Sequence, residues 1–414
     1  MFTKKLAILL MVGSIMFLLF FFTNTRLIIH YSDGMVHNHL LNTSAFKKLV
    51  RKNYTDLGYN RKYILLWTDP KTSPFIYFKE GTEIFKQKKC RWSNCYVTGD
   101  RFLLGSYTKF DVVVFNGPQL INNRNKNDLP EQRTFNQKFV YANIEAASNY
   151  PICTNIWDRY FNWTWTYKLN SDAVWGYMTI KDEKGQVIGP NSNILWLRDE
   201  EMDPISDDLK LKLNSKTKAA AWFVSNCDTQ SQREQYFMEL LRYLNQYNLD
   251  VDIFGECGNF KCPRNIMERC LIMLEKDYYF YFAFENSLSE DYVTEKILHP
   301  VNHYTVPIVL GGANYNRFMP PGSYINAIEL GTVKLAKTMD ALIKNKTEYH
   351  NMFKWKKYYS YHFKHESPDT DDYCQFCAMI NNSTLMNTIS IYDNFDMWWS
   401  DKNYCTDVLR WENF

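Results

Sequence analysis

The polar residues with the most specific spacing in this chain lie between two apolar runs, in the string YYFYFAFENSLSEDYVTEKILHPVNHYTVPIVLGG from Tyr278 to Gly312. An acid precedes an amide, a tyrosine follows six residues later, and a second acid then stands beside a cation. These candidates for ligand contact are Glu285, Asn286, Tyr292, Glu295 and Lys296. The cation suits an anionic group, and the acid beside it suits hydroxyl groups, because an anionic group would repel it.

The flanking residues predict the elements that position this set. Tyr278–Phe284 is aromatic and apolar throughout, which is typical of a strand buried on both faces. Asn286–Asp291 is turn-like, Thr294–His303 has apolar residues at helical spacing, and Val306–Leu310 is a second buried strand. In such a βαβ unit, ligands collect beyond the carboxyl ends of the strands, near helix N-termini. The alternative is a helix N-terminus with an ordinary surface Glu and Lys.

A further acid stands at the end of another predicted strand. KFVYANIE predicts a buried strand from Lys138 to Glu145, and the AASNYP that follows makes the chain turn. The carboxylate of Glu145 should therefore face the open end of the sheet. A surface acid at a strand end is the alternative.

A cation opens the helix predicted from about Ser231 to Tyr247. Arg233 lies in its first turn, where a positive charge opposes the helix dipole. An anionic ligand would remove this penalty, so Arg233 is a candidate for a diphosphate contact. The alternative is a solvated helix arginine.

The string from Tyr278 to Gly312 resembles the signature of the α1,3-fucosyltransferases, type II Golgi membrane enzymes of glycosyltransferase family 10. In that family FENS, DY[IV]TEK and [VI]P[VI]VLG occur in this order and spacing. Further blocks resemble the family in the same order along the chain: YFNWTWTYKLNSD, VSNCDTQSQREQY, VDIFGECG and YNRFMPPGSYI. Ala146, Lys168 and Asn170 depart from the usual Ser, Arg and Asp. Lys168 keeps the positive charge but loses the planar fork of a guanidinium.

The resemblance implies a GT-B fold, in which two Rossmann-like domains face a cleft. The predicted alternation of strands and helices agrees with such an α/β architecture. It also implies inverting transfer of L-fucose from GDP-fucose to the 3-hydroxyl of GlcNAc in a glycan, as part of protein glycosylation. The acceptor stays open between the core GlcNAc of an N-glycan, an antennal LacNAc or LacdiNAc unit, and a chitobiose-like end. The alternatives are a catalytically inactive lumenal glycan-binding protein, a structural Golgi protein, and a GT-B transferase for another nucleotide sugar.

Roles for single residues follow from the same resemblance. Glu145 would be the catalytic base, and Arg233 and Lys296 would neutralise the leaving GDP. The implied donor-binding residues are Arg233, Asn286, Tyr292, Glu295, Lys296, Ser225 and Asn226. Tyr167, Lys168 and Asp172 are either substrate contacts or parts of a hydrogen-bonded loop. Two cations make an obligatory metal unnecessary, so no metal-binding residue is assigned, and stimulation by Mn²⁺ or Mg²⁺ stays open.

An apolar N-terminal segment predicts membrane attachment. Leu6–Phe22 has no charged residue and follows Lys4 and Lys5, which predicts a signal anchor with the N-terminus in the cytosol and the rest in the Golgi lumen. The absence of a small-x-small cleavage site disfavours the alternative, a cleaved signal peptide. The predicted segments are a cytosolic tail (1–5), the transmembrane anchor (6–22), a stem (23–62), an N-terminal acceptor-side domain (63–212), a GDP-fucose-binding domain (213–366) and a C-terminal tail that packs back on the first domain (367–414).

All ten cysteines follow the apolar segment, and an even count in an oxidising compartment predicts disulfides. By resemblance, Cys374 and Cys377 pair with Cys90 and Cys95, and which joins which stays open. A zinc site at the CxxC pair is the alternative. The sequons also fit a lumenal glycoprotein; they begin at Asn42, Asn53, Asn162, Asn345, Asn381 and Asn382.

Composition excludes one class of partner. The net charge is +3 and no dense basic run occurs, which argues against nucleic-acid binding. The aromatic fraction of 17% suits sugar-stacking surfaces, although an aromatic-rich core explains most of these residues. The other predicted elements are strands at 63–68, 110–116 and 219–224, a strand and turn at 251–258, and helices at 332–344 and 348–359.

Overall fold

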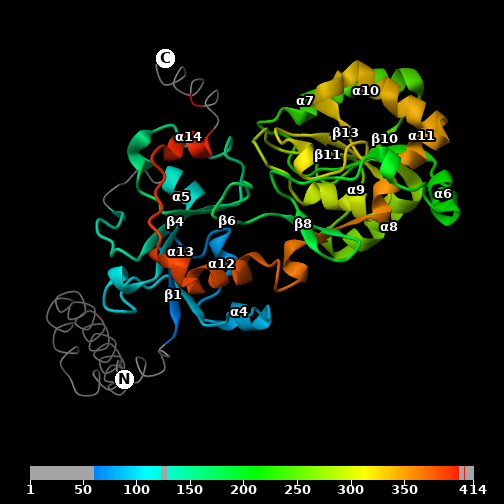
Figure 1. Cartoon of the computed structure of the whole chain (residues 1–414). Helices are drawn as coiled ribbons and strands as arrows, with labels where there is room; N and C mark the ends of the chain where they lie inside the picture. Colours follow the sequence, from blue (N-terminus) through cyan, green and yellow to red (C-terminus); the bar gives the residue numbers. More distant parts are fainter. Residues whose placement is uncertain (1–59, 123–127, 401–404, 406–414) are drawn as a thin grey trace, which may run out of the picture. The chain divides into compact units, whose positions relative to one another are not determined.

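A computed structural model of the chain describes residues 60–122, 128–400 and 405 (Figure 1). The predicted cytosolic tail, the predicted anchor and residues 23–59 of the predicted stem lie outside these ranges. Within the described residues, no helix is both long and apolar enough to cross a membrane.

The first half of the described chain forms a six-stranded parallel sheet with the order β2-β1-β3-β4-β5-β6. Its strands are β1 (Lys62–Leu66), β2 (Cys95–Thr98), β3 (Val112–Asn116), β4 (Lys138–Asn143), β5 (Trp163–Thr166) and β6 (Ala173–Val174). The predictions of β1, β3 and β4 are confirmed. Their apolar runs form central strands because both faces are covered; the four residues from Val112 to Phe115 are all 0% exposed.

The second half forms a five-stranded parallel sheet with the order β10-β9-β11-β12-β13. The strands are β9 (Lys218–Phe223), β10 (Val251–Phe254), β11 (Tyr278–Phe284), β12 (Val306–Leu310) and β13 (Ile325–Asn326). All seven residues of β11 are buried, as its uninterrupted aromatic run predicts. The coarse prediction of an α/β fold is therefore confirmed, with two parallel sheets.

Helices cover both faces of the second sheet (Figure 1). One face packs against α7 (Arg233–Leu244), α10 (Ala327–Lys344) and α11 (Lys346–Asn351). The other face packs against α8 (Met267–Asp277) and α9 (Leu298–Asn302). The helix predicted at 294–303 is a 3-10 turn at Glu295–Ile297 followed by α9. Further described helices include α4 (Glu83–Gln87), α5 (Gly117–Asn122), α6 (Asp207–Asn214) and α13 (Ser383–Asn387).

The helix predicted at 348–359 is wrong in its second part. α11 ends at Asn351, a 3-10 turn follows at Lys354–Lys357, and β14 (Tyr359–Phe363) begins where the helix was expected to end. β14 pairs antiparallel with β7 (Met178–Asp182), which also pairs with β8 (Val187–Gly189). Buried residues alternate along β14, so burial against a distant strand decides its structure.

The side chains of β7 pack with the second half of the chain. Met178 and Ile180 belong to one buried cluster with Leu274 of α8 and Val301 of α9. The predicted boundary between residues 212 and 213 and the other predicted domain limits stay predictions.

The C-terminal residues pack on both faces of the first sheet. Phe376 of α12 (Asp372–Asn381) stacks on Trp165 with ring centroids 4.0 Å apart. On the other face, Trp399 of α14 (Phe395–Trp399) lies 5.0 Å from the ring of Tyr141.

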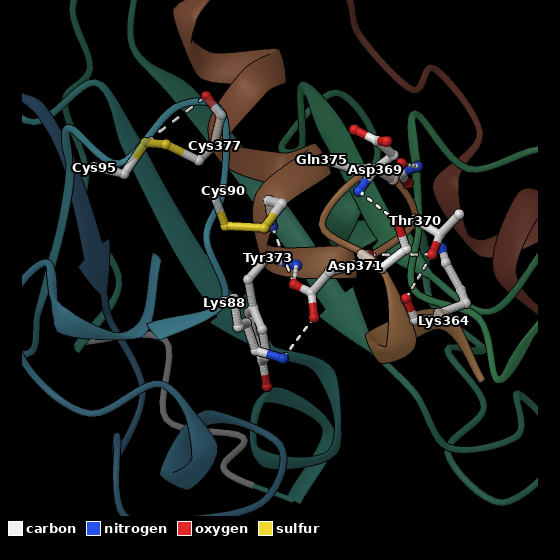
Figure 2. Close-up of a disulfide and its surroundings, with 12 residues drawn as sticks. Lys88, Cys90, Cys95, Lys364, Asp369, Thr370, Asp371, Tyr373, Gln375 and Cys377 are labelled. Carbon is white, nitrogen blue, oxygen red and sulfur yellow. Dashed lines mark hydrogen bonds and ion pairs between the residues drawn. A yellow bond between two sulfur atoms is a disulfide. The ribbon is translucent and has the colours of Figure 1, made fainter. Parts of the chain in front are cut away.

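Two disulfides join α12 to the first sheet region (Figure 2). Cys90 is bonded to Cys374 and Cys95 to Cys377, which are the four cysteines that the resemblance implied. Lys88 and Asp371 form an ion pair beside them at 2.5 Å. Because both thiols of the CxxC pair are oxidised, the zinc alternative is wrong.

Candidate active site

A pocket of about 670 Å³ lies at the carboxyl ends of β9, β10 and β11. Phe223, Phe254 and the residues that follow these strands form part of its wall. Six of the seven predicted donor-binding residues line it: Ser225, Asn226, Arg233, Asn286, Glu295 and Lys296. Parallel strands bring these segments together because their carboxyl ends meet at one edge of the sheet.

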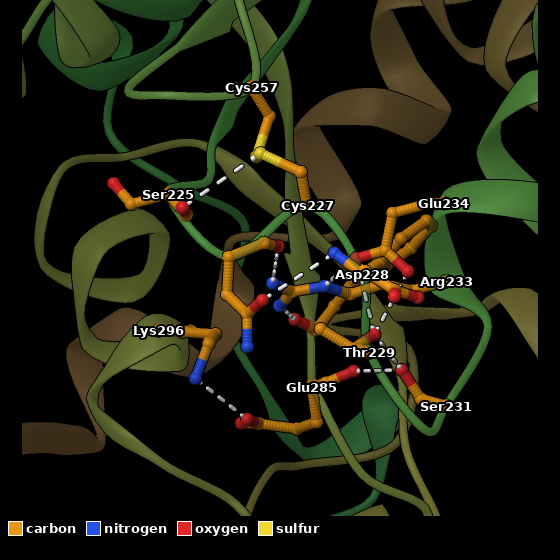
Figure 3. A network of polar contacts seen from close by, with 12 residues as sticks. Ser225, Cys227, Asp228, Thr229, Ser231, Arg233, Glu234, Cys257, Glu285 and Lys296 are labelled. Atoms are coloured by element: carbon orange, nitrogen blue, oxygen red, sulfur yellow. Dashed lines mark hydrogen bonds and ion pairs between the residues drawn. A yellow bond between two sulfur atoms is a disulfide. The ribbon is translucent and has the colours of Figure 1, made fainter.

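Arg233 lies inside the wall of this pocket and is only 3% exposed. Its Nη1 donates to Phe284 O at 2.7 Å and its Nη2 to Asn226 O at 2.9 Å (Figure 3). Its Nε pairs with Glu234 at 3.0 Å. The alternative of a solvated helix arginine is therefore wrong. A guanidinium has five N–H donors, so these three contacts fix its plane and leave two donors for a ligand.

Lys296 is held by the buried carboxylate of Glu285, a candidate for ligand contact to which no donor-binding role was assigned. Its Nζ lies 2.9 Å from Glu285 Oε2 (Figure 3). It also lies 2.7 Å from Thr294 Oγ1. Glu285 is 2% exposed and also accepts from the backbone N–H of Thr294 at 2.8 Å. The ammonium group is thus fixed at the start of the 3-10 turn that leads into α9. The available sequence signal was an acid directly after the buried strand β11.

The loop after β10 adds cations that the sequence reasoning missed. Lys261 and Arg264 line the pocket, which therefore holds four cationic side chains, with Arg233 and Lys296, against the carboxylates of Glu256 and Glu295. Burial lowers the pKa of His299, another lining residue, to about 4, so this imidazole is neutral at pH 7. Cations outnumber carboxylates among the lining residues, which suits an anionic ligand, while Glu234 and Glu285, which do not line the pocket, pair with Arg233 and Lys296.

Two disulfides brace the loops around the pocket. Cys227, after β9, is bonded to Cys257, after β10, and Cys262 is bonded to Cys270 of α8. Together with the two pairs above and Cys153–Cys405, they leave no free cysteine among the described residues.

Glu145 follows β4, and its backbone is held on both sides. Its N–H donates to Asn143 Oδ1 at 2.8 Å, and Tyr177 donates its hydroxyl to Ile144 O at 2.6 Å. Burial raises the pKa of the Glu145 carboxyl, the charge of Lys296 lowers it, and that of Glu295 raises it. Glu145 is not part of the described pocket lining, but its charge interacts with two residues that are.

Tyr292 is the predicted donor residue that does not line the pocket. It is 3% exposed, and its ring centroid lies 5.0 Å from that of Tyr167. Burial raises its pKa, so the phenol stays protonated and can only act as a neutral group.

The three predicted substrate contacts of the first half make contacts within the protein. Tyr167 accepts from Ala147 N at 2.9 Å, and Lys168 Nζ donates to Trp398 O at 2.6 Å. Asp172 Oδ2 accepts from Thr164 N at 2.8 Å. These contacts fit the alternative of a hydrogen-bonded loop, and a direct role in substrate binding stays a prediction.

One group of residues in the described part of the chain has metal-ligand spacing, namely Cys90, Asp371 and Cys374. Both of its sulfur atoms belong to a disulfide. These residues therefore do not fit a catalytic metal ion.

Comparison with known proteins gives matches over most of the chain. The family model described as "Glycosyltransferase family 10 (fucosyltransferase) C-term" matches residues 213–398, and "Fucosyltransferase, N-terminal" matches residues 59–178. Alpha-(1,3)-fucosyltransferase C of Drosophila melanogaster is 31% identical over 77% of this chain and 72% of that protein. Glycoprotein 3-alpha-L-fucosyltransferase A of the same organism is 31% identical over 81% of this chain and 60% of its own length. The human 3-galactosyl-N-acetylglucosaminide 4-alpha-L-fucosyltransferase FUT3 is 31% identical over 64% of this chain and 65% of its own length.

A solved structure described as an alpha1,3-fucosyltransferase with GDP-fucose aligns with 80% of this chain and 92% of that chain. The sequence identity is 15% and the TM-score is 0.45. A similarity of this size carries no argument about the present site.

Proposed function

Because the chain belongs to glycosyltransferase family 10, the fucosyltransferases, we propose that it transfers L-fucose from GDP-fucose to the 3-hydroxyl of a GlcNAc residue, with inversion at the fucose carbon. The names of the two Drosophila relatives support α1,3 transfer. The relatives differ in the acceptors that their names state, so the choice among N-glycan core, antenna and chitobiose-like end stays open.

One observation carries the assignment of the donor site. Residues from four separate segments, predicted from sequence to bind the donor, line one cationic pocket. Two of these residues, Lys296 and Glu295, shift the pKa of Glu145 by their charges. Arg233 and Lys296 are both fixed by contacts to buried oxygen atoms, so little reorganisation is needed when a diphosphate binds.

The mechanism follows from these positions. Glu145 removes the proton from the acceptor 3-hydroxyl as its oxygen forms a bond to the anomeric carbon of fucose. The bond from that carbon to the β-phosphate oxygen breaks, and GDP leaves with the electron pair. Arg233 and Lys296 stabilise the charge that develops on the diphosphate. Because the two cations supply this charge, we propose that no metal is obligatory, with Mn²⁺ or Mg²⁺ at most stimulating.

A second proposal concerns the cellular compartment. We propose a single-pass type II Golgi membrane protein whose catalytic region is lumenal. The uncharged segment Leu6–Phe22 after two lysines supports the anchor, and five disulfides among the described residues support an oxidising compartment. Protease protection in sealed Golgi vesicles tests this topology, because a cytosolic catalytic region would be digested without detergent.

The test of function is transfer to a panel of defined glycans, read by mass spectrometry. We expect one added fucose on at least one glycan that ends in, or contains, GlcNAc with a free 3-hydroxyl, from GDP-fucose but not from GDP-mannose or UDP-GlcNAc. Addition of EDTA should lower the rate of fucose transfer only slightly. Binding of glycan without any turnover would favour the inactive glycan-binding alternative, and turnover of only another donor would favour a different transferase.

A further inference from the structure

The turn that carries Glu145 is hydrogen-bonded directly to the turn that carries the donor residue Asn286. Ser148 Oγ lies within hydrogen-bonding distance of Ser287 Oγ and 2.9 Å from Ser289 Oγ. The backbone N–H of Ser148 also donates to Ser289 Oγ at 3.0 Å. Three hydroxyl groups, from segments 139 and 141 residues apart, thus meet between the two halves of the chain.

The direction of one chain of hydrogen bonds can be assigned. Ser287 Oγ lies 3.2 Å from Asn149 Oδ1, which can only accept. Since a hydroxyl has one proton, Ser287 donates to Asn149, and Ser148 donates to Ser287. Ser287 is 0% exposed, so water cannot easily replace a partner that it loses.

The serine contacts add to three other hydrogen bonds that hold the turn around Glu145. Asn143 and Tyr177 hold the backbone at and before Glu145, and Tyr167 accepts from the N–H of Ala147. All three of those contacts lie within the first half of the chain. The contacts of Ser148 with Ser287 and Ser289, and that of Asn149 with Ser287, tie the turn to the residues next to Asn286, whose side chain lines the donor pocket.

We propose that Ser148, through Ser287 and Ser289, is a positioning residue that fixes the distance between the catalytic base and the bound donor. We name Ser148, Ser287 and Ser289 the serine bridge. The proposal rests on the proposed function, because it concerns the geometry of the transfer step. None of the three serines lines the pocket at the strand ends, so the serine bridge acts by holding Glu145 opposite the fucose carbon.

A Ser148→Ala variant separates this role from a purely structural one. We expect kcat for fucose transfer to fall about tenfold or more, because a base displaced by a fraction of an ångström loses its alignment. The Kd for GDP should stay within about twofold, since Arg233 and Lys296 are unchanged. Ser148→Thr keeps the hydroxyl and should restore most of kcat. Ser287→Ala should lower kcat similarly, and the double variant should be no worse than either single variant.

Ser171→Ala is the matched control. Its hydroxyl lies 2.6 Å from Thr166 Oγ1, so the variant also loses a contact between two hydroxyls, but within the first half alone. We expect it to keep kcat. The proposal is overturned if wild-type protein transfers fucose and Ser148→Ala keeps kcat within twofold. It is equally overturned if both serine variants lower GDP affinity as much as kcat, or if their effects simply add. A wild-type protein that transfers no fucose refutes the proposed function itself.

Discussion

The carboxyl of Glu145 must be charged to act as a base, although its surroundings favour the neutral form. Burial is the largest influence and raises its pKa above 4.5, the ordinary value, and Glu295 adds to this effect. A raised pKa brings a carboxylate closer to the proton affinity that a general base needs at neutral pH.

The pH dependence of kcat should show this shift. Only deprotonated Glu145 accepts a proton, so we expect kcat to fall as the pH is lowered through its raised pKa, with the midpoint above 4.5. The measurement is kcat at saturating donor and acceptor between about pH 4 and 8. An acid limb with its midpoint at or below the ordinary value would contradict the assignment.

The positive charge of Lys296 should contribute mainly to donor binding. We expect Lys296→Ala to raise the Kd for GDP about tenfold to a hundredfold, as for the loss of a charge-assisted contact. Calorimetric titration with GDP measures this change. Lys218→Ala is the control, because Lys218 pairs with Asp252 at 2.7 Å in the same half but does not line the pocket. Equal Kd values for the two variants would exclude Lys296 from the donor site.

Single-residue roles could be predicted where the chemistry is local in sequence. Arg233 and Lys296 each follow a strand and open a helical turn, so their place near the strand ends was predictable. Glu285 was recognised as a candidate for ligand contact, but its ion pair with Lys296 was not predicted, because the two side chains meet only in the folded chain. Lys168 and Tyr167 have polar groups whose partners, Trp398 and Ala147, cannot be known from spacing alone.

Among the elements, the loop after β10 has the strictest backbone requirement. Gly255 has φ +109°, and a Cβ there would lie 2.3 Å from the carbonyl oxygen of Val224. That oxygen belongs to the segment that leads into Ser225 and Asn226. A side chain at Gly255 would therefore separate the two walls of the donor pocket.

We expect Gly255→Ala to weaken GDP binding and to destabilise the fold. Gly185→Ala is the control, because Gly185 also has positive φ, +76°, but a Cβ there meets nothing within 4 Å. The control should cost about 1 kcal/mol from its backbone conformation alone and leave GDP affinity unchanged. Denaturant unfolding and GDP titration of both variants decide the matter; equal losses of stability and unchanged affinity would mean that the close approach to Val224 is unimportant.

Strands and helices were easier to predict from the sequence when their structure does not depend on pairing with a distant strand. β11 is apolar at all seven positions, and its assignment followed from composition alone. β14 was not predicted, because Tyr359 and Tyr361 become buried only when the strand pairs with β7. The short β6 and β13 have two residues each, too few for a periodic pattern.

At the scale of the whole molecule, two disulfides close nearly the same long loop. Cys90–Cys374 and Cys95–Cys377 span 284 and 282 residues. Either bond alone restricts the unfolded chain almost as much as both, because the second closes only a short additional loop.

We therefore expect the loss of the two bonds to be non-additive. Replacing Cys90 and Cys374 by Ser should lower the free energy of unfolding modestly, and replacing all four cysteines should lower it by about 4 kcal/mol or more. Unfolding by denaturant without reductant measures both. Additive losses from the two pairs would show that local packing, and not restriction of the unfolded chain, explains their contribution.

The proposed mechanism requires that a cationic pocket of the second half binds the donor while Glu145 of the first half activates the acceptor. Its most direct test is Glu145→Gln, with fucose transfer and GDP affinity measured on the same preparation. We predict that transfer falls by at least about a hundredfold, that the Kd for GDP changes little, and that Tm at neutral pH does not fall, because the raised pKa means that the charged form is disfavoured in the folded protein. Transfer near the wild-type rate, or a loss that follows GDP affinity, would contradict the account.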